Sequence, residues 1–212
     1  MNPWLSIPAS DYEGHMAAVG QLAALGTVFR DVYVQTRPGR LAIVGCATGN
    51  GIEHVDATIT SEVIGVDVNS EYLSCARARF DGRGFTLTLR QADVARVEIA
   101  PATLDLVHVA LVLEYVDPAV VVSRVARWLS PGGVCCVVLQ RPSPTPAAIG
   151  ASSFSRFSSV AALAGVIRLH EPAAIEGLAE RAGLFRTRSW SVALPHDKGF
   201  HVGLFGKKRP WR

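Results

Sequence analysis

The stretch LAIVGCATGNG at residues 41–51 joins a short apolar run to a turn of glycines and small residues. A run that is apolar at every position is typical of a strand buried on both faces of a parallel sheet. Glycines directly after such a strand let the backbone turn sharply and approach a ligand closely. The stretch therefore predicts a buried strand over 41–45 followed by a ligand-binding turn.

Apolar strands alternate with helices on both sides of this stretch. Helices are expected over residues 11–35, 51–58, 69–80, 118–130 and 172–182, and strands over 41–45, 62–68, 85–93, 104–116 and 133–140, with 104–116 passing from a strand into a loop. Parallel strands need a crossover between them, so this alternation predicts a doubly wound α/β sheet with helices on both faces. The last two apolar runs, 184–195 and 200–208, are joined by the short turn PHDKG and should form an antiparallel hairpin.

Composition narrows the class of protein. Of 212 residues, 49% are hydrophobic and 18% charged, which fits one globular domain with a substantial core. The net charge of +3 is too small for a dedicated nucleic-acid binder. No run approaches about 20 apolar residues, and the N-terminus lacks the features of a signal peptide. The four cysteines, at 46, 75, 135 and 136, match no zinc pattern. We expect a cytoplasmic protein with reduced thiols, no metal, and neither nucleic acid nor membrane as partner.

Two acidic residues follow predicted strands at the edge where a doubly wound sheet binds its ligands. Asp67 lies 22 positions after Gly45, and such a carboxylate can accept hydrogen bonds from both ribose hydroxyls of a nucleoside. Asp93, with the backbone of Val94, could bind the amino edge of an adenine. The alternatives are an ordinary acid at a helix start for Asp67 and a loop acid for Asp93. The spacing from the glycine turn favours a nucleoside site.

The glycine turn does not fit the other common nucleotide motifs. A dinucleotide fingerprint needs the spacing G-x-G-x-x-G, whereas Asn50 stands where its third glycine should fall. The sequence also lacks the P-loop pattern G-x-x-x-x-G-K-[ST]. An NAD-dependent oxidoreductase is therefore disfavoured, and no Tyr-x-x-x-Lys pair is evident to support one.

Taken together, the motifs resemble those of the class I S-adenosylmethionine-dependent methyltransferases. The resemblance runs through LAIVGCATGNG, VIGVDVNSEYL, RQADV, LDLVHVALVLEYVDP and WLSPGGVCCVVL, and it is strongest over residues 36–140. It implies a Rossmann-like sheet of seven mostly parallel strands, with S-adenosylmethionine as cofactor and S-adenosylhomocysteine as product. The cofactor-binding residues that it implies are Gly45, Cys46, Ala47, Asn50, Asp67, Val68, Asp93, Val94, Val109, Ala110 and Tyr12.

Two positions depart from the family pattern. The family usually has an acidic residue two positions before the first glycine, where this chain has Ile43, and a glycine where it has Ala47. The methyl group of Ala47 narrows the space for close approach of a ligand. Asn50 and His15 are the candidates to supply the polar contact that Ile43 lacks. Both departures favour an alternative hypothesis, a catalytically inactive member of the fold that serves as a binding or interaction protein.

Candidate catalytic residues follow the fourth core strand and lie in the N-terminal segment. Methyl transfer needs positioning and exclusion of water, and an oxygen or nitrogen acceptor can also need a general base. Glu114 is the preferred base, with Tyr115 beside it. His15 is a further candidate, and His15 and Tyr12 are plausible lid residues, because the family often folds its N-terminal helix over the cofactor. His108 is more simply a core histidine.

The resemblance implies one methyltransferase domain over residues 1–212. We divide it into an N-terminal lid helix (1–37), a cofactor-binding core (38–140), a variable substrate segment (141–171) and a closing helix and hairpin (172–212). The fourth motif lacks the [DNS]-P-P-[YFW] signature of enzymes that methylate nucleic-acid bases or protein glutamine, and the extra segments are short. A small-molecule acceptor is therefore expected. Apolar residues of the variable segment either line its pocket or pack internally, namely Phe154, Phe157, Leu163 and Ile167. The chain could be a monomer or a homodimer.

Overall fold

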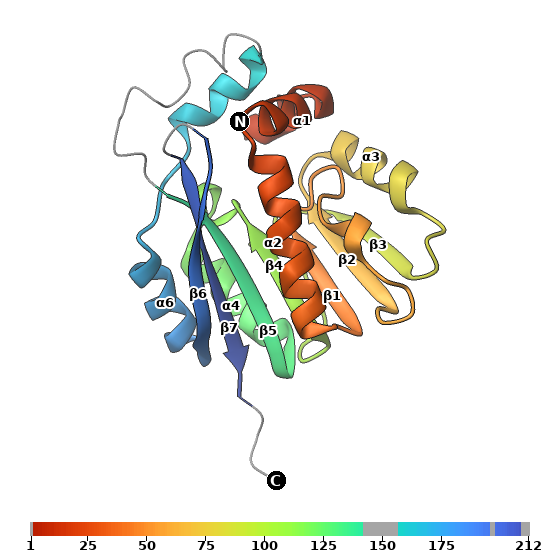
Figure 1. Ribbon diagram of the computed structural model, residues 1–212, viewed down its shortest axis with the longest axis vertical. Helices are drawn as coiled ribbons and strands as arrows, with labels where there is room; N and C mark the ends of the chain where they lie inside the picture. The colour runs from red at the N-terminus through yellow and green to blue at the C-terminus, as the bar shows by residue number, and fades with distance from the viewer. Residues whose placement is uncertain (1, 142–156, 196–197, 209–212) are drawn as a thin grey trace.

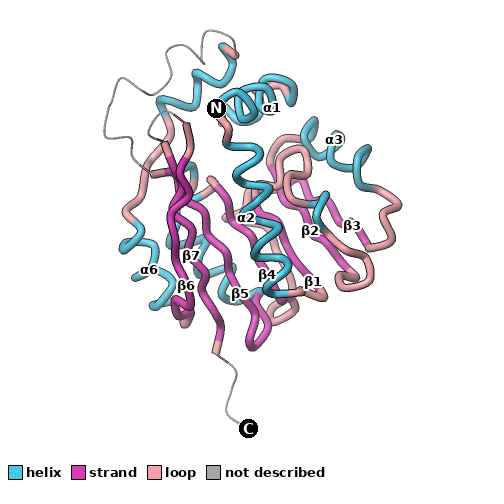
Figure 2. The backbone as a smooth tube through the Cα atoms, viewed as in Figure 1, coloured by secondary structure: helices cyan, strands magenta, loops and turns pink. Residues whose placement is uncertain are grey.

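The structure is a computed structural model that describes residues 2–141, 157–195 and 198–208. In this part of the chain, seven strands form one sheet in the order β3-β2-β1-β4-β5-β7-β6, with helices on both faces (Figures 1 and 2). The strands are β1 Arg40–Val44, β2 Glu62–Asp67, β3 Thr86–Gln91, β4 Leu104–Ala110, β5 Leu129–Gln140, β6 Leu184–Ala193 and β7 Gly199–Lys207. This confirms the predicted seven-stranded, doubly wound α/β fold.

Strand β1 lies in the middle of the parallel part of the sheet. It pairs in parallel with β2 on one side and with β4 on the other. Residues 41–44 are at most 3% exposed, which explains why every one of them is apolar. At the far edge, β7 pairs antiparallel with both β5 and β6. The predicted C-terminal antiparallel hairpin is therefore confirmed, whereas two residues of its PHDKG turn lie outside the described residues.

Each face of the sheet is covered by its own helices. Helices α4 Pro118–Trp128 and α6 Pro172–Arg181 pack on one apolar cluster, and α2 Gln21–Thr36 and α3 Ser70–Phe80 pack on the other. Figure 1 shows α2 crossing the near face of the sheet and α4 behind it. Neighbouring residues of a strand point to opposite faces, so Cys135 belongs to the first cluster and Cys136 to the second.

The helix starts follow from their capping residues. The side chain of Asn69 accepts hydrogen bonds from the backbone N–H groups of Glu71 and Tyr72, which confirms the predicted start of α3. Asp117 caps α4 in the same way, and Pro118 occupies its first turn. These two caps fix where the chain leaves β2 and β4, and both exits lie at the ligand-binding edge of the sheet.

Two helix predictions were wrong. The expected helix 11–35 is two helices, α1 Ala9–Ala18 and α2, because Gly20 adopts a left-handed φ of +72° between them. The expected helix 51–58 is only a 3-10 turn, η2 Ile52–His54. Gly51, at φ +97°, still belongs to the ligand turn and leaves too few residues for an α-helix before Val55 returns to an extended conformation.

The N-terminal segment is more complex than one lid helix. Only the 3-10 helix η1 Pro3–Ser6 and α1 lie at the ligand-binding edge, whereas most of α2 packs on the sheet. No described helix is long and apolar enough to cross a membrane. Residues 142–156 of the variable segment, including Phe154, lie outside the described residues, and the 3-10 helix η5 Ser158–Gly165 follows them.

Candidate active site

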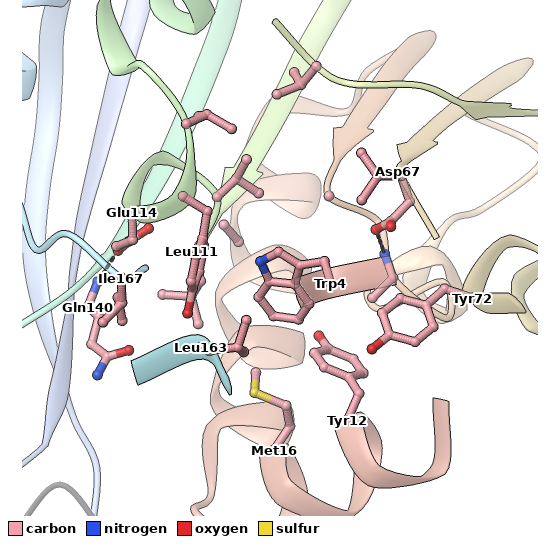
Figure 3. Close-up of a pocket in the computed structure, with 18 of the residues that line it drawn as sticks. Trp4, Tyr12, Met16, Asp67, Tyr72, Leu111, Glu114, Gln140, Leu163 and Ile167 are labelled. Carbon is pink, nitrogen blue, oxygen red and sulfur yellow. Dashed lines mark hydrogen bonds between the residues drawn. The ribbon is translucent and has the colours of Figure 1, made fainter. Parts of the chain in front are cut away.

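A cavity of about 280 Å³ lies at the carboxyl ends of β1, β2, β3 and β4. Its floor is formed by the residues that follow these strands, and η1, α1 and η5 cover it. Asp67 lies at one end, Glu114 and Gln140 lie at the other, and Trp4 projects between them (Figure 3). The cavity lies where the strand order reverses, between β1 and β4.

Asp67 forms the polar end of this cavity. One of its carboxylate oxygens accepts the N–H of Ala47 at 2.9 Å, and the other accepts the N–H of Asn69 at 2.9 Å. Burial nevertheless raises the pKa of this carboxyl above its ordinary value. The hydroxyl of Tyr72 lies on the same cavity, is buried and has no hydrogen-bond partner among the described residues. This end therefore offers a carboxylate and an unsatisfied hydroxyl to a polar ligand.

Eight of the eleven expected cofactor-binding residues line the cavity. They are Tyr12, Gly45, Ala47, Asp67, Val68, Asp93, Val94 and Ala110. The other three do not line it. Cys46 and Val109 are buried in the apolar clusters on opposite faces of the sheet, and the amide nitrogen of Asn50 donates to the Tyr12 hydroxyl at 2.9 Å. Asn50 thus acts on the wall of the cavity, through Tyr12.

The backbone of the glycine turn is strained at Ala47. This residue has a φ of +45°, a conformation that costs an L-residue roughly 1–2 kcal/mol. Its methyl group is buried against Ala9 and Tyr72. Strain of this kind persists only where the surroundings impose it, and it concentrates at functional sites. The turn therefore holds Ala47 in a backbone conformation that favours glycine while its side chain packs.

Ile43, which stands where the family usually has an acidic residue, lies in surroundings that favour an apolar side chain. Its side chain is 3% exposed and belongs to the apolar cluster beneath α2, beside Phe29 and Leu41. An acid at this position would be buried in this cluster, where burial lowers the pKa of its strand neighbour His108 to about 4 and so leaves that imidazole neutral. We expect Ile43→Asp to lower the free energy of unfolding by about 2–3 kcal/mol, measured by urea denaturation. Ile43→Val is the control, with an expected loss of about 1 kcal/mol, and equal losses for the two variants would contradict this account.

Glu114 forms the other end of the cavity. It is 1% exposed and lies in the 3-10 turn η3 Leu113–Tyr115. Its Oε1 accepts the backbone N–H of Gln140 at 2.8 Å, and its Oε2 has no hydrogen-bond partner in the part of the chain that the structure describes. Burial raises the pKa of the carboxyl to about 7. A half-satisfied buried carboxyl that titrates near neutrality can accept a proton from a ligand.

The other two catalytic candidates also line the cavity. The Tyr115 ring meets that of Trp4 edge-on at 5.0 Å, and burial raises the pKa of its hydroxyl, so this residue is a neutral phenol. Burial and the nearby Lys198 lower the pKa of His15, so its imidazole is neutral near pH 7. His108 does not line the cavity. It packs edge-on against Phe29 in the core, as the simpler interpretation expected.

Several lining residues were missed from the sequence. They include Asn2, Trp4, Met16, Gln21, Tyr72, Gln140 and Lys198. The variable segment adds Leu163 and Ile167, two of the four apolar residues that we singled out, whereas Phe157 contacts His15 instead. Trp4 is held by Asn69, whose amide donates to the Trp4 carbonyl at 2.9 Å. An aromatic residue ahead of the first helix was the only sequence feature that could have suggested Trp4.

Charged contacts fasten α1 over the glycine turn. The carboxylate of Glu13 pairs with Arg79 of α3 and accepts the Thr48 hydroxyl at 2.5 Å. We expect Arg79→Ala to accelerate amide hydrogen exchange in residues 9–18, while the free energy of unfolding changes by less than about 1 kcal/mol, because the ion pair is partly exposed. Arg30→Ala, which breaks the exposed pair with Asp31, is the matched control. Unchanged exchange in α1 would show that this contact does not hold the lid.

Comparison with known proteins agrees with the geometry. Residues 43–137 match the family described as a methyltransferase domain, and the strand order and cavity are those implied by the sequence motifs. The matched stretch is a little under half of the chain, and over this stretch the chain is similar to methyltransferase domains. The match begins at Ile43, so the family's sequence pattern is retained around the departures at 43 and 47.

Curated relatives resemble the core of this chain. A ubiquinone/menaquinone biosynthesis C-methyltransferase (UbiE) of Bdellovibrio bacteriovorus is 32% identical over 45% of this chain and 43% of its own length. A trans-aconitate 2-methyltransferase of Methylobacterium nodulans is 35% identical over 50% of this chain and 39% of its own. The chain thus spans less than half the length of these relatives.

Solved structures share the fold of this chain. An S-adenosylmethionine-dependent methyltransferase from Mesorhizobium loti superposes with a TM-score of 0.65 and 22% identity, over 84% of this chain and 95% of its own. The magnesium protoporphyrin IX methyltransferase ChlM from Synechocystis PCC 6803, with bound S-adenosylhomocysteine, gives a TM-score of 0.66 and 16% identity, over 90% and 84% of the two chains. At these identities, the likeness concerns the fold alone.

Proposed function

We propose that the protein transfers a methyl group from S-adenosylmethionine to a small-molecule acceptor, with Glu114 as the general base. One observation carries this proposal: the cavity has unsatisfied polar groups at opposite ends, the Tyr72 hydroxyl beside Asp67 and the Glu114 carboxyl. Such an arrangement suits two substrates that meet in one cavity. The apolar lining between the two ends excludes water from the reacting atoms.

The Asp67 end suits the nucleoside of the cofactor. Asp67 and the unsatisfied Tyr72 hydroxyl would bind ribose hydroxyls, and Asp93 with the backbone of Val94 would face the adenine. Gly45, which follows β1, and Ala110, the last residue of β4, would hold the amino-acid part. When bound, the cofactor supplies a methyl group that is already activated on a sulfonium. The remaining tasks fall to the residues at the other end.

The Glu114 end suits the acceptor. Its Oε2 can take the proton that an acceptor hydroxyl or amine loses as that atom gains the methyl group. Leu163 and Ile167 of the variable segment, with Trp4, form the apolar walls of this end. A cavity of about 280 Å³ has room for a small molecule, so we propose a small-molecule acceptor and not a macromolecular one. Tyr115 and His15, both neutral, would orient the acceptor and are secondary candidates for a catalytic role.

Two further properties belong to this proposal. Ile43 and Ala47, which suggested an inactive binding protein, fit into the packing of the core and the turn and leave the cavity open. We therefore favour an enzyme over that alternative.

We also propose a cytoplasmic location, because all four cysteines are free and three of them are buried. The division into lid, core, substrate segment and closing hairpin is retained as a working description, with the lid reduced to η1 and α1.

The proposal is tested by binding and then by turnover. Isothermal titration should show that S-adenosylmethionine and S-adenosylhomocysteine bind with micromolar dissociation constants. A screen of small hydroxyl- and amine-bearing acceptors, scored by formation of S-adenosylhomocysteine, should then give turnover with at least one compound class. Folded protein that is free of carried-over ligand and binds neither compound would rule out the methyltransferase activity and favour the binding-protein alternative.

A further inference from the structure

We propose that Gln21, Lys198 and the first turn of α2 form a carboxylate-binding subsite within the cavity. The inference rests on the proposed methyl transfer and deepens it, because it assigns an anionic group to one of the two substrates. That group is either the carboxylate of the cofactor's amino-acid part or a carboxylate on the acceptor. The chemistry of the subsite is the same in both cases.

The start of α2 is open to an anion. The helix has 16 residues, and none of the described side chains caps its first turn. The first N–H groups of a helix lack partners within the helix, and its dipole favours negative charge at this end. Gly20, at φ +72°, turns the chain so that α2 begins at the cavity, with its first residue, Gln21, on the lining.

Gln21 supplies an independent observation. Its side chain is 6% exposed and lines the cavity. No hydrogen bond of its amide is found in the described part of the chain, although a buried amide normally has a partner. The amide therefore presents an unused N–H₂ donor to whatever occupies the cavity.

Lys198 provides the charge. It lines the same cavity, close enough to His15 to lower the pKa of that imidazole. The N–H of Leu194 donates to the Lys198 carbonyl at 2.9 Å, which fixes the end of the hairpin. Pro195 of the same hairpin lies against Gly20, so the start of α2 and Lys198 approach the cavity from adjoining walls. Among the described residues, no carboxylate forms an ion pair with Lys198.

The remaining charges favour a single carboxylate. Asp67 and Asp93 belong to the nucleoside end, and Glu114, on the lining near Gln140, is largely neutral below its pKa of about 7. The described lining contains no arginine, the side chain typical of phosphate sites. One ammonium, one amide and a helix start match the charge and the acceptor atoms of one carboxylate.

The test uses paired ligands that differ in the carboxylate. S-Adenosylhomocysteine and 5′-methylthioadenosine share the nucleoside, and only the first carries an amino-acid carboxylate. Benzoate and benzamide differ in the same way on the acceptor side, and both are titrated into free protein and into protein saturated with S-adenosylhomocysteine. The variants are Lys198→Gln, Lys198→Arg and Gln21→Glu. The last keeps the size of the side chain and suits a helix start while repelling an anion.

Losing a charge-assisted hydrogen bond should weaken binding about tenfold. If the cofactor occupies the subsite, Lys198→Gln and Gln21→Glu weaken the binding of S-adenosylhomocysteine and leave the affinity for 5′-methylthioadenosine unchanged. If the acceptor occupies it, the same substitutions weaken the binding of benzoate and leave the affinities for benzamide and both nucleosides unchanged. In either case, Lys198→Arg should bind the affected carboxylate ligand with near wild-type affinity. Lys208→Gln, which removes an exposed charge, should leave all of these affinities unchanged.

The inference is overturned if Lys198→Gln and Gln21→Glu bind both carboxylate ligands with wild-type affinity. It is also overturned if these variants lose as much affinity for the ligand without a carboxylate as for the matched carboxylate ligand. Failure of the methyltransferase proposal gives a different result. In that case the wild-type protein binds neither nucleoside, while the benzoate titration of free protein still tests the subsite.

Discussion

Asp67→Asn should raise the dissociation constant of S-adenosylhomocysteine about 100- to 1,000-fold while the protein stays folded. The carboxylate is the charged acceptor at the nucleoside end of the cavity, and each hydrogen bond to a charged group contributes roughly 1.5–3 kcal/mol. Two ribose hydroxyls would lose such bonds together. Isothermal titration of wild-type and variant protein measures the change directly.

The asparagine variant is chosen because Asp67 also holds the glycine turn. Its oxygens accept the N–H groups of Ala47 and Asn69, so alanine would release the turn and mix a folding effect with a binding effect. Asparagine keeps one acceptor for these bonds. Asp81→Asn, at an exposed aspartate just after α3, is the matched control. Wild-type affinity in Asp67→Asn would move the nucleoside site away from this end of the cavity.

The residues that could be predicted from the sequence are those that short-range chain geometry places. Gly45, Asp67 and Asp93 each lie at or just after a core strand, and parallel strands bring their carboxyl ends to one edge. Knowing the strands was therefore sufficient to bring these residues together. The same reasoning found Glu114, because it lies four residues beyond the end of β4.

The missed residues reach the cavity through packing between distant segments. Trp4 is placed by a hydrogen bond from Asn69, 65 positions away. Lys198 arrives because β7 pairs antiparallel with β5, and Gln21 because the chain turns at Gly20. An isolated glycine is tolerated inside many helices, so the apolar pattern that continues through Gly20 concealed this turn. Neither spacing nor composition specifies such long-range contacts.

Glu114→Gln should lower kcat about 100- to 10,000-fold with the best acceptor while cofactor affinity stays within about twofold. Loss of general-base catalysis is of this size, and the glutamine oxygen can still accept the N–H of Gln140. The substitution therefore removes the proton acceptor and keeps the local structure. Glu180→Gln, at an exposed glutamate of α6, is the matched control. An unchanged kcat would exclude Glu114 as the base.

The pH dependence of turnover gives a second readout of Glu114. Below its pKa of about 7, the carboxyl is protonated and cannot accept a proton. For wild-type protein, kcat/KM should therefore rise with pH and level off above about pH 7. The variant should lose this rise and keep only its low residual rate. A rise that persists in Glu114→Gln would assign the titration to another group.

The same titration predicts that the functional glutamate destabilises the fold. Its pKa is near 4.5 in the unfolded chain and about 7 in the folded one. The contribution of the neutral carboxyl to the free energy of unfolding is therefore fully present below about pH 4.5 and is lost as pH rises through 7. The loss amounts to about 3 kcal/mol. Glu114→Gln stays neutral, so urea denaturation should find it more stable than wild type at about pH 8 and similar near pH 4.5. Lower activity combined with higher stability at the same pH is the result expected when a buried catalytic carboxyl is replaced. If Glu114 were purely structural, its replacement by glutamine would lower the free energy of unfolding and leave the pH dependence of kcat/KM unchanged.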